Sequence, residues 1–576
     1  MTNLELAATF RDIANILEIK GENVFRIRAY SRAAQNIESL SEDINDYIRD
    51  GRLSEIPGIG HDLSERIEEY ASTGKIKIYE GLKKSIPEGL IALLSIPSVG
   101  PKTAKLLYEK LKIKNIAGLE KAISANKLQG LFGIKEKTVE NIKKGIEIFK
   151  RGKERMTLAQ AAYLADTFVA TLKKLPEVKM ISPAGSLRRQ KETVRDIDIL
   201  VVSKQPEKVM KTFITGPNVR DVLAHGPTKA SVRTKEDVQL DCRVVEEKSF
   251  GAALVYFTGS KNFNIKIRQL AIRKKLKVNE YGIFSATKRG RKGAKFVCGR
   301  TEEEVFKTLG MSFVPPEMRE NNGEIELALK NKLPQLIEQK DIRGDLHAHS
   351  TWSDGGNKII EMAQAAKKLG YSYIAITDHS QSLKVANGLS IADLKRKKKE
   401  IEQVNKTLKN FRVLFGTEVD IDAQGNIDYP DQVLADFDVV VAAIHTGFKQ
   451  SSQQLTKRIV RACQNKYVHI IAHPTGRLWG TREPYNISLE EILKVAKETN
   501  THLEINAFPN RLDLNDVECR RAKEVGVKMS IDTDSHETAQ LSAMRFGLAV
   551  ARRGWLERGD VINTLTLEKM LKELKK

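Results

Sequence analysis

Hydrophobic and polar positions divide the chain into three stretches of different texture. Residues 1–150 read as helices separated by short turns of glycine and proline, which predicts an almost wholly helical region. From about residue 155, apolar runs of strand length alternate with helices and predict a mixed α+β region. The predicted strands there include VRDIDILVVS (194–203), DVQLDCRVVEE (237–247) and AALVYFTGS (252–260).

After Arg343 the texture changes to a regular alternation of strands and helices, which is typical of an α/β domain with a parallel sheet. Just before it, VPPEMRENNGEIELALKNKLPQ has a break of proline, asparagine and glycine followed by a polar helix, so we expect a linker. Residues 285–300 read as a basic turn region. A chain of 576 residues has room for roughly four domains.

A loose repeat runs through the helical stretch. It reads LSEIPGIGHDLSERI from Leu53, LLSIPSVGPKTAKLL from Leu93, and less regularly LQGLFGIKEKTVENI from Leu128. Each copy is an apolar helix end, a tight turn with glycine, and a new helix whose N-terminus suits a phosphate. The repeat resembles the helix-hairpin-helix, which implies that Gly58, Gly60 and Gly100 lie at a DNA-backbone contact, whereas a single copy would fit an ordinary helical corner.

Charge and composition narrow the class of protein. The net charge is +22, of which residues 1–340 carry +18 and residues 341–576 carry +4. The asymmetry favours a nucleic-acid partner over generic solubility. No apolar run reaches the length of a membrane span, the first twenty residues lack a signal-peptide core, and the four cysteines form no CxxC pair. We therefore expect a cytoplasmic protein with no membrane partner.

Carboxylates on two of the predicted strands form a first chemical constellation. Asp196 and Asp198 alternate on one strand and so share a face, and Asp241 lies on a second strand. Solvated acids at a strand edge would be the plain interpretation of the first pair. The oxygens of three such carboxylates also suit hard divalent cations as ligands. Two of these ions about 4 Å apart promote phosphoryl transfer. Gly185, Ser186 and the arginines after them would supply donors for a triphosphate.

These motifs carry a resemblance. GSLRR before DIDIL, then LDCRVV, YFTGSKNFNIKIR and VNEYGIF, resemble family X DNA polymerases of the DNA polymerase beta type over residues 1 to about 318. The resemblance implies that Asp196 and Asp198 bind both metals, and that Asp241 completes one site and draws the proton of the primer 3′-hydroxyl. It further implies that Gly185, Ser186 and Arg189 bind the nucleotide phosphates.

The same resemblance assigns residues around YFTGS. It implies that Tyr256 and Phe257 face the sugar and disfavour a ribose 2′-OH, where core aromatics would be the plain interpretation, and that Gly259 belongs to the nucleotide-binding residues. Asn264 matches a position that contacts the incoming base. Arg268 matches one that contacts the template strand, although a solvated helix face would also explain an arginine there.

Histidines form a second constellation. Residues 341–576 hold eight of the ten histidines, and seven apolar runs there end in histidine, aspartate or glutamate. Ligands at the C-terminal ends of parallel strands are how a barrel builds its active site, and imidazole with carboxylate suits Zn²⁺, Mn²⁺ or Fe²⁺. We therefore predict a metal site.

This set resembles the PHP (polymerase and histidinol phosphatase) domain, which implies a seven-stranded (β/α) barrel holding up to three ions. The implied ligands are His347, His349, Asp354, His379, Glu418, His445, His473, Asp534 and His536. Glu418 would bridge two metals. Glu504 and Asn506 are interpreted as supporting residues, and His469 and His502 as packing or surface residues.

Together these features predict a multidomain protein. The expected domains are a helical hairpin domain (1–85), a second helical domain (86–154), an α+β nucleotidyltransferase palm (155–250), a thumb-like subdomain (251–318), a linker (319–341) and the barrel (342–576). The expected activities are gap filling from dNTPs in DNA repair with Mg²⁺ or Mn²⁺, and a 3′–5′ exonuclease with Mn²⁺ or Zn²⁺ in the barrel, with abasic-site endonuclease as a further activity. We expect a monomer. Template-independent nucleotidyl transfer and a DNA-binding scaffold with inert sites are the alternatives.

One departure from the resemblance concerns abasic-site chemistry. Lyase-competent relatives place a nucleophilic lysine where this chain has Arg66, and a phosphate-binding lysine where it has Asp62. A guanidinium stays charged and cannot form a Schiff base. We therefore expect no deoxyribose-phosphate lyase activity from this helix.

Overall fold

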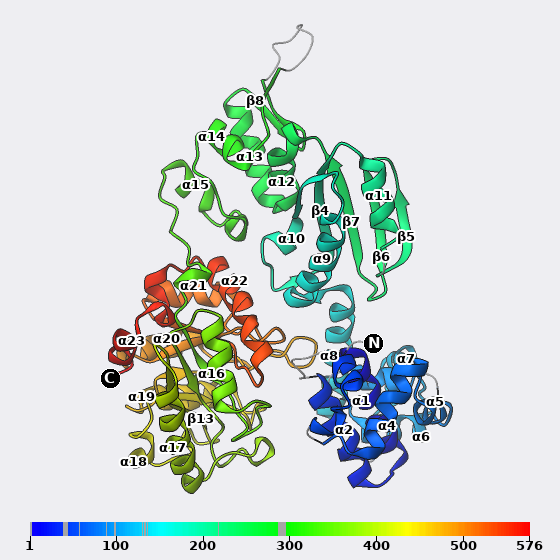
Figure 1. Cartoon of the computed structure of the whole chain (residues 1–576), viewed down its shortest axis with the longest axis vertical. Coiled ribbons are helices and arrows are strands. Elements are labelled where there is room, and N and C mark those ends of the chain that lie inside the picture. The colour runs from blue at the N-terminus through cyan, green and yellow to red at the C-terminus, as the bar shows by residue number, and fades with distance from the viewer. Residues whose placement is uncertain are drawn as a thin grey trace.

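The computed structural model describes residues 3–38, 44–56, 58–87, 89–96, 99–129, 131, 134, 136–216, 218–285 and 295–576. Figure 1 shows a blue helical body at the N-terminus, a sheet-containing body in cyan and green, and a barrel that runs from green-yellow to red at the C-terminus. None of the described helices is long and apolar enough to cross a membrane.

The N-terminal body consists of helices that surround two small apolar cores. One core joins Leu6, Phe10 and Ile13 to Ile37 and Ile67, and the other is built around Leu93, Leu107 and Leu119. The helices are α1 (Asn3–Lys20), α2 (Val24–Glu38), α3 (Ile44–Arg49), α4 (His61–Thr73), α5 (Lys77–Lys84), α6 (Pro101–Leu111), α7 (Ile116–Ser124) and α8 (Glu136–Glu154).

The region expected as the palm, for which we keep that name, is a five-stranded mixed sheet in the order β2-β4-β7-β6-β5. Strand β4 is parallel to β7 and antiparallel to β2, so the two acidic runs of the sequence lie side by side. The strands are β2 (Val178–Pro183), β4 (Asp196–Ser203), β5 (Val219–His225), β6 (Lys229–Thr234) and β7 (Gln239–Val245), with the short pair β1 (Met156–Thr157) and β3 (Thr193–Val194). The accompanying helices are α9 (Leu158–Lys173), α10 (Gly185–Arg188) and α11 (Pro206–Ile214).

The thumb corrects one expectation. The run AALVYFTGS was predicted as a strand, but residues 250–258 form helix α12 (Phe250–Thr258), whose residues are mostly buried. A short run that is apolar on every side does not distinguish a buried helix from a buried strand. The other thumb elements are α13 (Lys261–Arg273), β8 (Leu276–Asn279), β9 (Gly282–Ser285), β10 (Phe296–Cys298) and α14 (Glu302–Thr308). Most of the predicted basic turn, residues 286–294, lies outside the described residues.

The segment expected as a linker is packed against the thumb. Arg319 is fully buried, and its guanidinium pairs with Glu302 at 2.7 Å. Ile325 and Ala328 of α15 (Glu324–Leu329) join the thumb's apolar core, as does Trp555 from the barrel. These contacts attach the thumb to the barrel.

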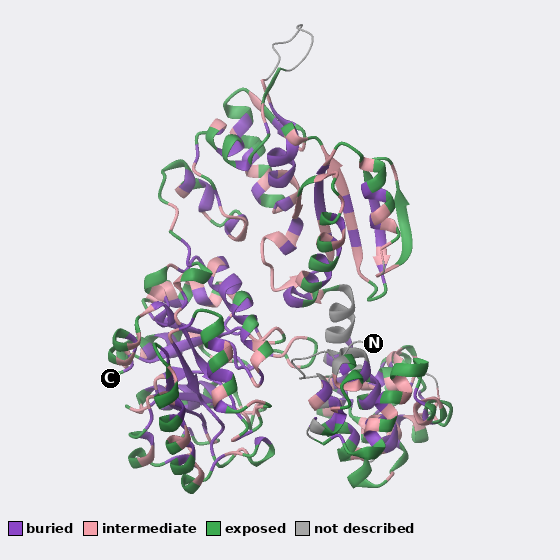
Figure 2. Ribbon diagram, viewed as in Figure 1, coloured by how far each residue is buried: buried purple, intermediate pink, exposed green. Residues whose placement is uncertain are grey.

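The C-terminal domain is a parallel sheet of seven strands in sequential order, β11 to β17. The two edge strands approach each other, since His349 N donates to Ser535 O at 2.8 Å, so the sheet is a nearly closed barrel. The strands are β11 (Gly344–Ala348), β12 (Tyr373–Ile376), β13 (Arg412–Asp420), β14 (Val439–Ala443), β15 (Ile470–Ile471), β16 (His502–Asn506) and β17 (Met529–Asp532). All the strand residues except Arg412 at the start of β13 are buried, and Figure 2 shows these strands in purple.

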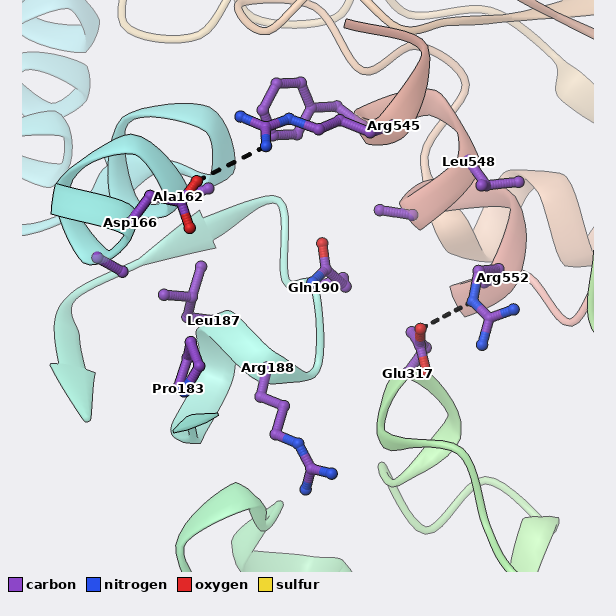
Figure 3. Close-up of a pocket in the computed structure, with 13 residues that line it drawn as sticks. Ala162, Asp166, Pro183, Leu187, Arg188, Gln190, Glu317, Arg545, Leu548 and Arg552 are labelled. Carbon is purple, nitrogen blue, oxygen red and sulfur yellow. Dashed lines mark hydrogen bonds and ion pairs between the residues drawn. The ribbon is translucent and has the colours of Figure 1, made fainter. Parts of the chain in front are cut away.

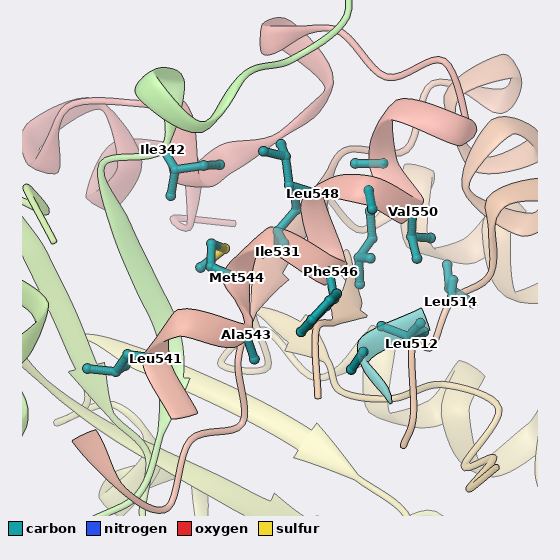
Figure 4. Close-up of a cluster of buried hydrophobic side chains, with 14 of the residues drawn as sticks. Ile342, Leu512, Leu514, Ile531, Leu541, Ala543, Met544, Phe546, Leu548 and Val550 are labelled. Atoms are coloured by element: carbon teal, nitrogen blue, oxygen red, sulfur yellow. The ribbon is translucent and has the colours of Figure 1, made fainter. Parts of the chain in front are cut away.

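Helices cover the outside of the barrel. They are α16 (Ile359–Lys368), α17 (Ile391–Thr407), α18 (Asp431–Leu434), α19 (Ser452–Gln464), α20 (Leu489–Glu498), α21 (Asp516–Val525), α22 (Met544–Arg553) and α23 (Leu567–Glu573). Helix α22 contributes Met544, Phe546 and Val550 to the core beside Ile531 (Figure 4). Phe546 also meets Tyr163 of the palm edge-on at 6.2 Å, so α22 lies between the two domains.

Candidate active sites

The first two hairpin repeats fold into the same local geometry. A one-turn helix is followed by a tight turn, with Ile59 N bonded to Ile56 O and Val99 N to Ile96 O, both at 3.0 Å. Gly60 and Gly100 then cap α4 and α6 with nearly identical extended backbone angles. Gly58 has a φ of +77° and lies against Arg32, a conformation and approach that favour glycine. Gly133 of the third repeat lies outside the described residues.

The palm carboxylates lie on adjacent parallel strands. In the register of β4 and β7, Asp198 is directly opposite Asp241, and Asp196 is opposite Gln239. The Asp241 carboxylate accepts hydrogen bonds from the Ser231 hydroxyl and, at 3.1 Å, from Gln239. The three acids are not among the described clusters whose ligand atoms all lie within 4.8 Å of one another. The fold brings their strands together without gathering their oxygens that closely.

Asp198 is the most perturbed of these acids. Burial and the neighbouring charges of Asp196 and Asp241 raise the pKa of Asp198 to about 6. Gly185 has a φ of +62°, and a Cβ there would stand 2.6 Å from Asp198 Oδ2. A glycine is therefore needed at the first residue of α10, which passes over this carboxylate.

Ser186 lies in the single turn of α10 and Arg189 caps its C-terminal end, but Arg189 is engaged by the protein itself. Its Nε atom lies 3.0 Å from Glu320, and Nη1 donates to the carbonyl of Thr258. Its neighbour Arg188 pairs with Glu302 at 2.6 Å. Sequence reasoning did not foresee these partners, because they come from segments far along the chain.

The thumb positions lie near this turn. Tyr256 and Phe257 pack edge-on at 5.1 Å near the end of α12, and Arg243 of β7 lies over the Phe257 ring at 4.7 Å. The Asn264 side chain donates to Tyr256 O at 2.6 Å, and Arg268 donates to Asn264 O at 3.2 Å. The first of these bonds joins α13 to α12, and the second lies within α13. At the bend between the helices, a Cβ on Gly259 would lie 3.2 Å from Arg189 Nη1.

The nine predicted barrel residues converge at the C-terminal ends of the strands. Eight of them form three overlapping groups that could each hold a metal ion. The groups are His349, Asp354, His379 and His536; His347, His349 and Asp534; and His379, Glu418 and His445. The ninth, His473, places Nε2 at 2.9 Å from Glu418 Oε1. By contrast, His469 bonds to the backbone of Val440 and lies outside these groups.

Glu418 is the centre of this arrangement. One oxygen lies 2.9 Å from His379 Nδ1, and the other lies 3.2 Å from His445 Nε2. Burial would raise the pKa of Glu418, but the surrounding imidazoles outweigh it and hold that pKa well below its usual value. A buried anion with histidines on both sides has the arrangement of a bridging ligand.

The donor set fits a divalent transition metal. Burial and the nearby imidazoles His536 and His379 lower the pKa of His349 to about 4. Burial and Arg511 lower the pKa of His473 to about 3. Both rings are therefore neutral at pH 7, the form that binds metal. The buried Nδ1 atoms of these two histidines have no hydrogen-bond partner in the structure.

A layer of supporting residues surrounds the ligands. Glu504 accepts a hydrogen bond from His347 Nδ1 at 2.6 Å and from the His473 backbone at 2.6 Å, as expected for a supporting residue. Asp420 bonds to His445 Nδ1 at 2.9 Å and was missed. Its signal was its position two residues after Glu418, on the same face of β13. Such partners orient metal-binding histidines.

Palm and barrel meet around a pocket of about 430 Å³. Figure 3 shows Leu187 and Gln190 facing Leu548 on α22, with ion pairs joining Asp166 to Arg545 and Glu317 to Arg552. The Arg545 pair is exposed, and its atoms are 3.7 Å apart. The two domains are thus held by apolar packing and by ion pairs around this pocket.

Fold and sites define a class of protein: helical hairpins, then a sheet domain with three acids and a thumb, joined to a barrel whose histidines and acids could hold metal ions. Residues 1–76 match the helix-hairpin-helix domain, 90–147 the SAM-like helix-hairpin-helix tandem, 253–320 the DNA polymerase beta thumb and 345–508 the PHP domain. The chain belongs to the family X DNA polymerases that carry a C-terminal PHP domain.

Individual relatives cover different parts of the chain. The DNA polymerase/3′-5′ exonuclease PolX of Bacillus subtilis is 39% identical over 570 residues, 99% of this chain and 98% of its own. DNA polymerase lambda of Rattus norvegicus is 24% identical over 55% of this chain and 56% of its own. A probable phosphatase of Thermoanaerobacter sp. (strain X514) is 31% identical over 40% of this chain and 95% of its own.

Proposed function

We propose that the protein fills short gaps in DNA from dNTPs, as directed by a template, and trims 3′ ends in its barrel. The observation that carries the synthetic half is the parallel pairing that sets Asp198 opposite Asp241, with the turn of Ser186 and Arg189 beside them. The exonuclease half rests on the nine-residue cluster in the barrel and on the PolX relative, whose name includes this activity.

In the palm, Asp196, Asp198 and Asp241 would hold Mg²⁺ or Mn²⁺, since all three offer hard oxygen ligands. Two such ions supply charge that activates an attacking oxygen and stabilises a leaving one. Asp241 takes the proton of the primer 3′-hydroxyl, Ser186 and Arg189 bind the triphosphate, and Gly185 lets the backbone approach. Tyr256, Phe257 and Gly259 select the deoxyribose, while Asn264 and Arg268 contact the base pair and the template.

In the barrel, the nine residues His347, His349, Asp354, His379, Glu418, His445, His473, Asp534 and His536 would hold up to three Mn²⁺ or Zn²⁺ ions. These ions would supply a nucleophile at neutral pH and neutralise the scissile phosphodiester. Asp420 and Glu504 keep their histidine partners in one orientation. An abasic-site endonuclease activity would use the same ions.

The hairpin glycines Gly58, Gly60 and Gly100 would bring backbone N–H groups to the phosphates of gapped or primed DNA. We propose a DNA-repair role for a monomer. The cytoplasm is part of this proposal, because the structure joins none of the four cysteines in a disulfide.

A primer-extension and degradation assay on gapped duplex tests both halves. With dNTPs and Mg²⁺ we expect extension that stops at the end of the gap; without dNTPs and with Mn²⁺ we expect shortening from the 3′ end. Extension of single strands at the same rate would support template-independent transfer instead. If neither extension nor shortening occurs with any of the metals, the result would support an inert DNA-binding scaffold.

A further inference from the structure

The Glu320 carboxylate lies where thumb, palm and barrel meet, and cations of two domains share one of its oxygens. Oε1 is 3.0 Å from Arg189 Nε, 3.1 Å from Arg553 Nη1 and 3.9 Å from Lys191 Nζ. Burial would raise the pKa of Glu320, but these three cations outweigh it and lower that pKa. The carboxylate is therefore ionised, and its buried charge is stabilised by these cations.

Arg553 is the partner that the barrel contributes. It ends α22, its side chain is 3% exposed, and its Nη2 lies 2.6 Å from Asp516 at the start of α21. Its Nη1 also donates to the backbone carbonyl of Arg189 at 2.8 Å. One guanidinium thus anchored in the barrel contacts both the nucleotide-binding turn and the counterion of that turn's arginine.

Arg189 directs Nε to Glu320 and Nη1 to the Thr258 carbonyl, so turning the whole guanidinium to a triphosphate requires its Nε to leave Glu320. If it leaves, Glu320 loses its nearest cation in a site where its side chain is 17% exposed. An unpaired carboxylate in such surroundings opposes the movement. Arg553 remains 3.1 Å away, however, and holds the carboxylate after Arg189 has gone.

We propose that Arg553 of the barrel is a positioning residue of the polymerase: it retains Glu320 and the Arg189 carbonyl, so that the Arg189 guanidinium can move to the triphosphate. The inference rests on the proposed function, in which Arg189 binds the phosphates. It makes the barrel part of nucleotide binding although it touches no nucleotide.

The test is steady-state gap filling by the full chain, with KM for dNTP and kcat measured separately. Arg553→Gln should raise KM roughly tenfold, which corresponds to about 1.4 kcal/mol, with kcat nearly unchanged. Adding Glu320→Gln to Arg553→Gln should return KM to the wild-type value or below, because no carboxylate is then stranded. A merely structural role of Arg553 would not give this rescue.

Arg552→Gln is the matched control. Arg552 precedes Arg553 on α22 and crosses the same interface to Glu317 at 2.8 Å and to Ile337 O at 2.8 Å, but among the described residues it makes no hydrogen bond or ion pair with the nucleotide-binding turn. Its KM should stay at the wild-type value. The exonuclease rate of each variant, measured in the same preparation, reports whether the barrel is intact.

An unchanged KM in Arg553→Gln, or a raised KM that Glu320→Gln does not restore, would overturn the inference. If Arg553→Gln does not fold, Glu320→Gln alone decides: KM should fall below the wild-type value, and a KM that does not fall would overturn it. Arg189→Gln distinguishes a failure of the inference about Arg553 from a failure of the proposed function. An unchanged KM in that variant would contradict the proposed role of Arg189 itself.

Discussion

Arg477 of the barrel and Glu192 of the palm form a two-pronged ion pair, with Nη1 to Oε2 at 3.1 Å and Nη2 to Oε1 at 2.8 Å. Arg477 follows the barrel residue His473 by four positions, and Glu192 precedes the palm residue Asp196 by four. Both side chains are largely buried, at 9% and 17% exposure. The pair therefore joins the segments that carry the two candidate active sites.

Breaking this pair should loosen the two domains. Glu192→Gln leaves the Arg477 charge buried but still bonded to the Arg511 carbonyl, so we expect a loss of about 2–3 kcal/mol. Thermal unfolding and limited proteolysis measure it. Arg545→Gln removes an exposed pair across the same interface and should cost less than about 0.5 kcal/mol. Equal losses in the two variants would contradict the special role of the buried pair.

Synthesis and exonuclease activity should depend on different residues. Asp198→Ala removes the proposed shared metal ligand of the palm and should reduce synthesis by orders of magnitude while gapped-DNA binding and exonuclease activity persist. His349→Ala removes a residue common to two of the barrel's ligand groups and should abolish exonuclease activity while synthesis continues. Extension and degradation of one labelled primer measure both. Synthesis that survives Asp198→Ala would refute the assignment.

The raised pKa of Asp198 predicts a pH-dependent stability. Because that pKa lies near 6, above its ordinary value of 3.8, the folded chain binds the proton more tightly between these values. This stabilisation is lost as the pH rises through 6. In EDTA at pH 8, Asp198→Asn should therefore unfold at a higher temperature than the wild type, by about 1–2 kcal/mol in stability.

At pH 5 the difference should shrink to about half, because the folded carboxyl then carries its proton whereas the unfolded one, with a pKa of 3.8, is still ionised; below pH 3.8 it should vanish. Asp221→Asn, which removes an exposed acid on β5 of the same sheet, is the control and should change neither midpoint. An Asp198→Asn variant that is no more stable than the wild type at pH 8 would contradict the interpretation.

The partner of His445 should set metal affinity. Asp420→Asn weakens the bond that orients the imidazole, so we expect metal affinity to fall roughly 10–100-fold. Metal retained after dialysis against a competing chelator measures this without reference to activity. Asp422→Asn lies two residues away in an exposed turn and should retain the wild-type metal content. Equal metal retention by Asp420→Asn and the wild type would count against an orienting role.

Helix α4 should show no lyase chemistry. Arg66 lies on α4 with its guanidinium 3.5 Å from Glu69, and it has no amine to attack an abasic sugar. Borohydride treatment with a 5′-incised abasic duplex in EDTA should trap no covalent adduct. An adduct that maps to residues 1–80 would show that another amine serves, with Lys75 and Lys77 the first to examine.

The sequence by itself predicted the order of helical, mixed and barrel regions and the side chains that the structure brings together in each candidate site. Alternation predicted a shared face for Asp196 and Asp198, and parallel strands expose their C-terminal ends on one side, so the histidines could be grouped without a structure. These inferences succeed because a strand's period is local and the ligand residues are adjacent to the strands that place them.

Tertiary structure decided what depends on distant segments. The run AALVYFTGS forms a helix although its sequence fits a buried strand equally well. A run that is apolar on every side is compatible with both elements, and packing within the thumb decides between them. Glu320 at Arg189 and Arg477 at Glu192 are separated from their partners by 131 and 285 residues. No local pattern predicts such pairs. The sequence specifies the charge of each side chain, but the tertiary fold determines which distant residue lies close enough to neutralise it.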